Sequence, residues 1–292
     1  MFQKNSFRVI LLVLVICLFN VGGCGSEEGT DTGTNNGTTQ NGAAESLISI
    51  SQLDIGDMVV DGTWEWGHRV GENYSGSGEQ KPVVWILAAK DHYETEEGIG
   101  SVTLVAGELI GLHVFDDSTD RGHPRGNNTW RDSGEPDAEN GLRKFLNQEF
   151  YGAISAPFRE AILNTELPNA TLAGETYITS DRVFALSQTE LGGGAQDTHV
   201  IGERLPYFNI DDPAELAQRR IGVLDGNPVS YWTRSPSSEF GFTARFVHGE
   251  NGWFYRHYTD NAEMGVRPAL NVHSGVEVTE RPNEKGIHEI RW

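Results

Sequence analysis

Residues 46–292 contain no cysteine, and this constrains the fold more than any other feature of the sequence. The chain has two cysteines, Cys17 and Cys24, and both lie near its N-terminus. No disulfide and no thiolate metal site can therefore stabilise this long stretch, so its stability has to come from a hydrophobic core. Hydrophobic residues make up 37% of the chain, which together with 35 glycines is ordinary for a globular protein. The many glycines favour turns and irregular loops over long helices.

Residues 46–292 read as one α+β domain. Aromatic residues occur along the whole stretch, and no low-complexity segment or internal repeat divides it. Strand patterns outnumber helical ones and the helices lie in the middle of the chain, which argues against an alternating βαβ fold. Periodicity predicts strands at Met58–Val60, Val83–Ala88, Val102–Ala106, Leu109–Phe115, Val183–Leu186, Phe240–Val247, Trp253–Tyr258 and Val266–Val272, and helices at Asn140–Tyr151, Ala156–Asn164 and Pro213–Ile221.

Residues 1–24 have the composition of an export signal. Lys4 and Arg8 precede an apolar run from Val9 to Phe19, and small residues follow it. The run is too short for a transmembrane helix, which needs about 20 apolar residues. The sequence from Val21 to Cys24 resembles the lipobox of bacterial lipoproteins, which implies that Cys24 is diacylated and becomes the first mature residue. The alternative is an ordinary cleaved signal in which Cys24 is incidental.

We therefore expect a signal peptide at 1–23, a lipidated Cys24 with a flexible Gly- and Thr-rich tether over 24–45, and a globular domain at 46–292. The expected location is outside the cytoplasm, anchored to a bacterial membrane. Removal of Lys4 and Arg8 changes the net charge from −20 to −22. Anionic lipid repels such a domain, so the acyl chains would have to hold it at the membrane. Because the net charge is strongly negative, we also expect no nucleic-acid partner.

Five segments resemble a domain family of unknown function that occurs in exported and surface proteins of bacteria. The resemblance runs from about Gly56 to Val272. The segments are PVVWILAA around Trp85, Trp130 followed by GLRKFLNQEFY, SDRVFALSQTEL from Ser180, YWTRSP from Tyr231 and GVRPALNV from Gly265.

The last part of the chain is also similar to C-type-lectin-like and formylglycine-generating-enzyme-like domains. An aromatic-Trp-x-Arg-Ser turn comes first, then two strands separated by a Gly turn, then a last strand bearing Arg267. The resemblance implies a single compact, loop-rich domain with a short twisted antiparallel sheet and two to three helices. It implies no function, because one fold hosts many functions.

Three arginines in these motifs are candidates for structural roles. A guanidinium presents five donors and is suited to fixing loop carbonyls or a carboxylate inside a loop-rich domain. We interpret Arg143 and Arg267 in this way. Arg234 is open to both interpretations, and together with Trp232 it is kept as a ligand-binding candidate.

The segment after Asn251-Gly252 is the main candidate for ligand binding. Alternation along a hairpin strand would place Trp253, Tyr255 and His257 on one face and Phe254, Arg256 and Tyr258 on the other. Both faces are then aromatic. One face would pack in the core, while the other offers rings for stacking on a sugar or a peptide. Core packing of the whole set is the alternative. The ligand candidates here are Trp253, Tyr255, Arg256 and Tyr258.

An acidic loop before the first helix is a weak calcium candidate. Ca²⁺ takes six to eight oxygen ligands, and four carboxylates lie close together in this loop. A solvated acidic loop is the alternative, so we expect no cofactor beyond this calcium option. The four residues are Asp132, Glu135, Asp137 and Glu139.

The sequence lacks the familiar catalytic motifs. It contains no GxSxG, HExxH or GxxxxGK[ST] pattern, and no histidine has a second one at a zinc-binding helical spacing. The paired thiols of formylglycine-generating enzymes and the His-x-x-x-His-x-Glu triad of the related sulfoxide-forming oxidases are also missing. We expect a lipid-anchored, non-catalytic binding module for a glycan or a protein. A structural envelope component acting through protein contacts, and an enzyme using scattered carboxylates, are the alternatives.

Overall fold

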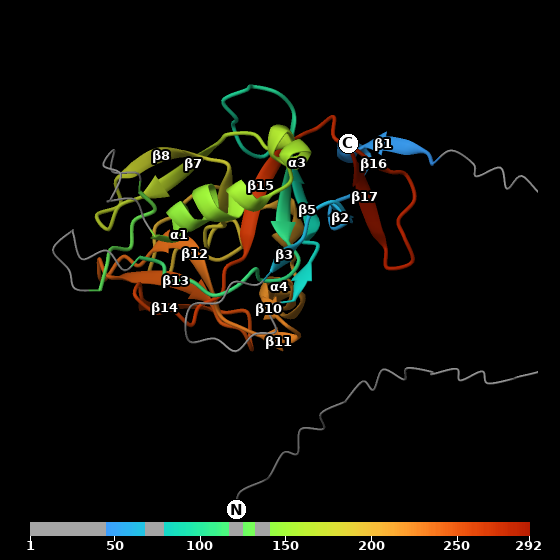
Figure 1. The fold of residues 1–292 in the computed structure, drawn as a ribbon. Coiled ribbons are helices and arrows are strands. Elements are labelled where there is room, and N and C mark those ends of the chain that lie inside the picture. The colour runs from blue at the N-terminus through green and yellow to red at the C-terminus, as the bar shows by residue number, and fades with distance from the viewer. Residues whose placement is uncertain (1–44, 68–78, 117–124, 132–140) are drawn as a thin grey trace, which may run out of the picture. The chain divides into compact units, whose positions relative to one another are not determined.

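The computed structural model describes residues 45–67, 79–116, 125–131 and 141–292. Residues 44–292 form one compact unit, which is described here by itself. Within these described ranges, no helix has the length and apolarity needed to cross a membrane. The unit is an α+β fold with many strands and few helices (Figure 1).

An eight-stranded sheet is the largest element of the domain. Its neighbouring strands are antiparallel except for β17 and β2, which pair in parallel. The sheet is therefore larger than the short antiparallel sheet that we expected, and it is mixed. In spatial order its strands are β1 (Leu47–Ser49), β16 (Glu277–Thr279), β17 (Ile287–Arg291), β2 (Met58–Val60), β5 (Val84–Lys90), β6 (Ser101–Ala106), β15 (Pro268–His273) and β9 (Val183–Ala185).

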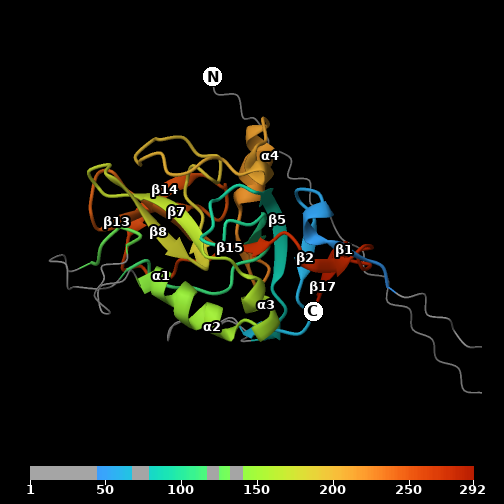
Figure 2. The same cartoon turned by 90° about the horizontal axis from the view of Figure 1, so that it is seen from above.

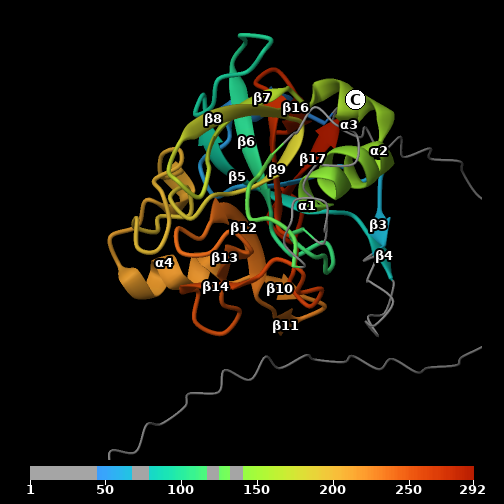
Figure 3. The ribbon, with the colours of Figure 1, turned by 90° about the vertical axis from the view of Figure 1, so that its left-hand side faces the viewer.

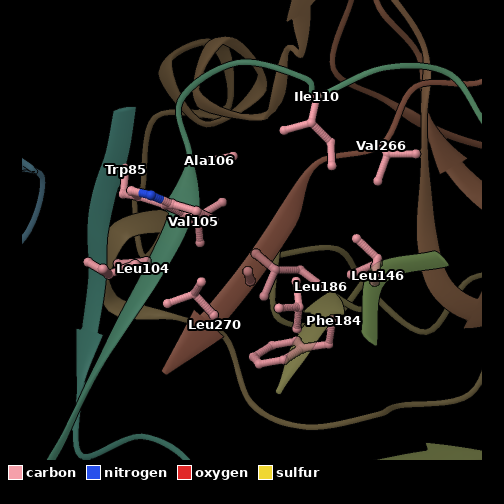
Figure 4. Close-up of a cluster of buried hydrophobic side chains, with 14 of the residues drawn as sticks. Trp85, Leu104, Val105, Ala106, Ile110, Leu146, Phe184, Leu186, Val266 and Leu270 are labelled. Carbon is pink, nitrogen blue, oxygen red and sulfur yellow. The ribbon is translucent and has the colours of Figure 1, made fainter. Parts of the chain in front are cut away.

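The core lies on both faces of the central strands of this sheet. Alternation along β5 places Trp85 and Leu87 inside, both fully buried, and every residue of β6 is buried. In Figure 4 the side chains of Trp85, Leu270 and Phe184, from β5, β15 and β9, gather in one cluster. Side chains of the strands thus form much of the hydrophobic core.

Helices cover part of this core, and the three predicted helical segments are confirmed. The first is continuous through α1 (Gly141–Lys144), a π-helix (Phe145–Phe150) and α2 (Tyr151–Ala153). Two others follow as α3 (Ala156–Ala161) and α4 (Pro213–Arg220). Local signals explain their starts, because Ser155 caps α3 and Asp212 caps α4, each with a proline in the first turn. Short 3₁₀ turns occupy Ile50–Gln52 and Pro206–Phe208.

A separate three-stranded antiparallel sheet lies away from the β1–β16–β17 end of the large sheet, as Figures 1, 2 and 3 agree. It has the order β12 (Tyr231–Pro236), β13 (Thr243–Val247) and β14 (Phe254–Tyr258). This sheet contains most of the predicted ligand candidates. Three two-stranded pairs complete the fold, namely β3 (Trp66–Gly67) with β4 (Gln80–Lys81), β7 (Thr165–Ala170) with β8 (Thr176–Asp181), and β10 (Val223–Leu224) with β11 (Asn227–Pro228).

Seven of the eight predicted strands are present, and two predictions were wrong. The segment Leu109–Phe115 forms no strand, because its backbone bonds irregularly, for example from Ile110 N to Val266 O. The YWTRSP motif is not a turn but the fully buried strand β12. No strand was predicted at the positions of β1, β3, β4, β7, β8, β10, β11, β16 and β17.

Candidate functional site

The two ligand candidates on β12 lie inside the protein. Trp232 is 1% exposed, and its indole Nε1 donates to the carbonyl of His113 at 2.9 Å. Its ring packs edge-on against Phe115 and Phe246 at 5.7 and 6.4 Å between centroids. Trp232 therefore presents no surface to a ligand, contrary to its place among the candidates.

Arg234 is also buried, with no exposed surface. Its Nη1 and Nη2 both donate to the carboxylate of Glu190, and Nη1 also donates to the carbonyl of Ala185 at 3.0 Å. Burial acts to lower the pKa of Arg234, but the adjacent Glu190 carboxylate outweighs it and raises that pKa above its ordinary value. Of its two sequence interpretations, the contacts place Arg234 in the structural one.

The other two motif arginines also bind groups of the protein itself. Arg143 is 5% exposed, and its Nε donates to Asp181 at 2.6 Å, which joins the first helical segment to the end of β8. Arg267 is 4% exposed and donates to the carbonyls of Ala106 at 2.9 Å and Arg219 at 3.1 Å. Both arginines thus link segments that are distant in the sequence.

Strand β14 differs from β12, because four of its five residues are exposed and Phe254 is half-buried. It is an outer strand of the three-stranded sheet, and its register with β13 runs without a bulge from Val247–Phe254 to Thr243–Tyr258. Side chains therefore alternate regularly between two faces. Neither face is buried as a whole, so the expectation that one of them packs in the core was wrong.

The first face of β14 carries Arg256 and Tyr258, and its rings are engaged within the chain. Tyr258 stacks on Phe242 at 5.9 Å and 21°, and the Arg125 guanidinium lies 4.0 Å from the Tyr258 ring centroid. Phe242 also contacts Phe240 at 5.5 Å, and the Arg256 guanidinium lies 5.3 Å from the Phe240 centroid. A row of three rings thus runs between two guanidinium groups, which pair with acids of their own.

This row, the ring stack, consists of Arg256, Phe240, Phe242, Tyr258 and Arg125. Arg256 pairs with Glu239, and Arg125 lies 3.9 Å from a carboxylate oxygen of Asp260. Contacts between cations and ring faces stabilise such rows by about 0.5–1 kcal/mol each at exposed sites. Phe240, Phe242 and Arg125 were not among the sequence candidates, since nothing in the local pattern marks them. Tyr258 serves the stack, so its ring is less free for a ligand than we expected.

The second face, the open face, consists of Tyr255 and His257 of β14 together with Trp253, which directly precedes the strand. Trp253 is 64% exposed, and its indole contacts no other ring in the described part of the chain. Tyr255 is 42% exposed, tilted against Phe246 at 6.0 Å and edge-on to His248 at 5.5 Å. His257 is exposed beside them. The open face thus offers one free indole and one partly supported phenol, with polar atoms nearby.

Two cavities of the described part of the domain lie away from β14. An apolar one of about 380 Å³ lies on the outer side of the large sheet, between Met58, Ile86 and Ile287, with Trp66 and Ile110 on its walls. A polar one of about 470 Å³ is lined by β8 together with Arg131, Arg143 and residues of the β7–β8 turn. Residues of β14 line neither of these two cavities.

Two sets of predicted residues lie outside the described residues. These are Cys24 and the calcium candidates Asp132, Glu135, Asp137 and Glu139. Across the ranges that the structure does describe, no three His, Cys, Asp or Glu side chains come together as a metal site would require.

Comparison with known proteins gives one match. A family model described as a domain of unknown function, DUF6273, matches residues 100–274, which is more than half of the chain and includes both the YWTRSP and the GVRPAL segments. No curated protein and no solved structure matches the chain. The protein therefore belongs to the DUF6273 family of domains of unknown function.

Proposed function

We propose that this protein is a non-catalytic binding module whose open face, Trp253, Tyr255 and His257, contacts a glycan or protein ligand. One observation carries the proposal. Five aromatic residues are exposed in the part of the chain that the structure describes, and four of them, Phe240, Trp253, Tyr255 and Tyr258, belong to the three-stranded sheet and its connections. Exposed aromatic clusters of this kind mark binding surfaces.

The distribution of rings on that sheet supports the choice of face. The ring stack ties Phe240 and Tyr258 to partners within the chain, so their exposure has a structural explanation. Trp253 has no such explanation, because its indole is the most exposed large apolar side chain described and packs on no other ring. Exposure of the apolar indole surface to water is unfavourable, and a ligand that covers the ring removes this cost.

The same proposal includes where the binding module is located and how it is anchored. The Val21–Cys24 segment and the Gly- and Thr-rich stretch after it support a lipid-anchored domain outside the cytoplasm, held at a distance from a bacterial membrane by a tether. Three consecutive antiparallel strands followed by the Arg-preceded strand β15 support a C-type-lectin-like arrangement at the end of the chain.

The test uses the chain from residue 24 with Cys24→Ser, so that no lipid is attached. It is applied to glycan and peptide arrays alongside Trp253→Ala and Tyr255→Ala. We expect each variant to lose at least about tenfold in affinity for whatever the parent binds, since aromatic anchors dominate such interfaces. Trp292→Ala is the matched control. Trp292 is 47% exposed, but it follows β17 of the large sheet and its ring lies against Phe158.

The proposal fails if both open-face variants stay folded and bind the array ligands as the parent does. It also fails if Trp292→Ala weakens binding as much as they do. If the parent chemically converts a ligand whose binding depends on Trp253 and Tyr255, the protein is an enzyme, and the non-catalytic part of the proposal is wrong.

A further inference from the structure

The backbone of β14 has a free edge whose orientation can be derived. His248 N donates to Trp253 O at one end of the β13–β14 ladder, and Thr259 N donates to Phe242 O at the other. Hydrogen-bonded pairs alternate with non-hydrogen-bonded pairs in an antiparallel ladder, so the residues 253, 255, 257 and 259 face β13. The N–H and C=O groups of Phe254, Arg256 and Tyr258 therefore point away from β13, at the outer edge of the sheet.

Arg256 is the centre of this edge. Its two neighbours have outward carbonyls that are already used, since Phe254 O accepts from Arg245 Nη2 at 3.4 Å and Tyr258 O accepts from Asn261 N at 3.2 Å. For Arg256, no described residue bonds its outward N–H or C=O. A donor and an acceptor directed the same way from one residue match the backbone of another extended chain.

Apart from the charge of Arg256, the usual sequence features that protect free edges are missing from this strand. Edges are commonly protected by proline, by lysine or by a bulge. β14 has the sequence FYRHY, its register has no bulge, and four of its residues are exposed. The irregular register of this sheet lies on the opposite outer strand, between Trp232 and Pro236 of β12. Among the residues that the structure describes, nothing pairs with the backbone of this edge at Arg256.

The charge of Arg256 indicates which kind of chain can pair with this edge. The strand contains Arg256 and no acid, in a chain with 42 acidic and 22 basic residues. Two copies of β14 paired about a two-fold axis at Arg256 would place these arginines directly opposite each other on one face, which is destabilising. The ion pair with Glu239 runs through Nη1 and uses one part of a fork with five donors. A second carboxylate opposite Arg256 therefore fits, and a second copy of this chain does not.

We propose that β14 binds an extended peptide as a fourth, antiparallel strand, with an acidic residue opposite Arg256 and apolar residues on either side of it packed against Tyr255 and His257. The proposal rests on the proposed function, because it uses the same open face, and it names the ligand class as peptide. Main-chain hydrogen bonds supply affinity in this mode, and alternate side chains supply specificity.

The probe is the acetylated and amidated peptide Ser-Thr-Tyr-Glu-Tyr-Thr-Ser, titrated against the full chain from residue 24 with Cys24→Ser. N-methylation of the central Glu removes the N–H that would donate to Arg256 O, and we expect at least about tenfold weaker binding. N-methylation of the preceding Tyr is the matched control, because that N–H points away from β14, and binding should stay within about twofold. Replacing the central Glu by Lys should weaken binding about fivefold.

Two protein variants separate backbone from side chain. Arg256→Pro removes the outward N–H without breaking the ladder to β13, and it should abolish peptide binding. Arg256→Ala keeps the backbone groups, so it should still bind the peptide but lose the preference for Glu over Lys. If Arg256→Pro does not fold, the two N-methylated peptides decide the matter.

The outcomes distinguish this inference from the function on which it rests. No binding of the peptide at about 1 mM, or equal loss from both N-methylated peptides, overturns strand addition. Glycan binding that needs Trp253 but is unaffected by Arg256→Pro leaves the binding module intact and overturns the peptide. A dimer of the chain that Arg256→Pro dissociates shows that a second copy occupies the edge and also overturns it.

Discussion

The two outer strands of the small sheet have similar sequences and opposite environments. β12, YWTRSP, and β14, FYRHY, each carry aromatic residues and one arginine, yet β12 is fully buried and most of β14 is exposed. The partners of the two arginines show the same difference. Arg234 meets the buried carboxylate of Glu190, whereas Arg256 meets Glu239 at the surface. An aromatic and arginine-rich motif therefore indicates binding only when nothing else in the chain covers it.

Replacing Trp232 of β12 or Trp253, which directly precedes β14, should break this comparison most strongly. Trp232→Ala leaves a cavity among rings and an unpaired His113 carbonyl, and we expect a loss of about 3–5 kcal/mol in the free energy of unfolding. Trp253→Ala should change it by less than about 0.5 kcal/mol, because the indole packs on little. Urea denaturation of both variants checks this. Similar losses in the two would contradict the assigned environments.

Removing the carboxylate partner of Arg234 should cost nearly as much. Glu190→Gln keeps the size of the side chain but leaves a buried guanidinium without its counter-charge, so we expect about 3–5 kcal/mol of destabilisation. The variant Glu190→Gln/Arg234→Met tests the cause, since it removes both charges and should recover part of the loss. A double variant as unstable as Glu190→Gln alone would assign the loss to packing instead of charge.

Alkaline pH should reveal the buried strand through Tyr231. Burial raises the pKa of Tyr231 above its ordinary value of 10.0, although Arg267 and Arg220 act in the opposite direction. The folded protein then keeps a proton that the unfolded chain releases, so this stabilisation is complete below about pH 10 and is lost as the pH rises further. Tyr231→Phe loses the hydrogen bond to Arg220 O, about 1 kcal/mol at neutral pH.

Above about pH 10, the unfolding free energy of the parent should fall relative to that of Tyr231→Phe by up to about 1.4 kcal/mol for each pH unit, so that the difference of about 1 kcal/mol at neutral pH closes and then changes sign. Tyr255→Phe, on the exposed strand, is the control in the same titration. A constant difference across this range would show that Tyr231 is not buried in the way described.

The smallest effect is expected at the exposed ion pair. Glu239→Gln should lower the free energy of unfolding by less than about 1 kcal/mol, because both side chains remain in contact with water. The same variant frees the Arg256 fork from its own acid, so it should strengthen binding of the Glu-centred peptide about twofold to fivefold. Weaker binding in Glu239→Gln would mean that Glu239 positions Arg256 for the ligand.

Local patterns predicted much of this fold. The three helical segments follow from their periodicity, the last of them begins at its cap Asp212, and the strands β5, β6 and β15 follow from apolar runs. These features depend on neighbours within a few residues, which a sequence shows directly. The α+β class follows from the same patterns, because their order along the chain is visible.

The environments of the site residues could not be predicted in this way. The burial of Arg234 depends on Glu190, 44 residues earlier in the chain, and the ring stack depends on Arg125, more than a hundred residues before Tyr258. The alternation of side chains on β14 was predicted correctly, but which face is free is set by Phe240 and Phe242, which arrive from outside the strand. Contacts over such separations leave no mark on a short sequence window.

The parallel pairing of β17 with β2 has a consequence for how the protein folds. Met58 of β2 lies beside Ile287 of β17, about 230 residues later, and β17 sits inside the sheet between β16 and β2. Contacts of such long range slow folding, because a large loop must close before they form. During synthesis this edge of β2 stays unpaired until β17 has been made. Until β17 pairs with it, that edge of β2 is exposed to pairing with other molecules.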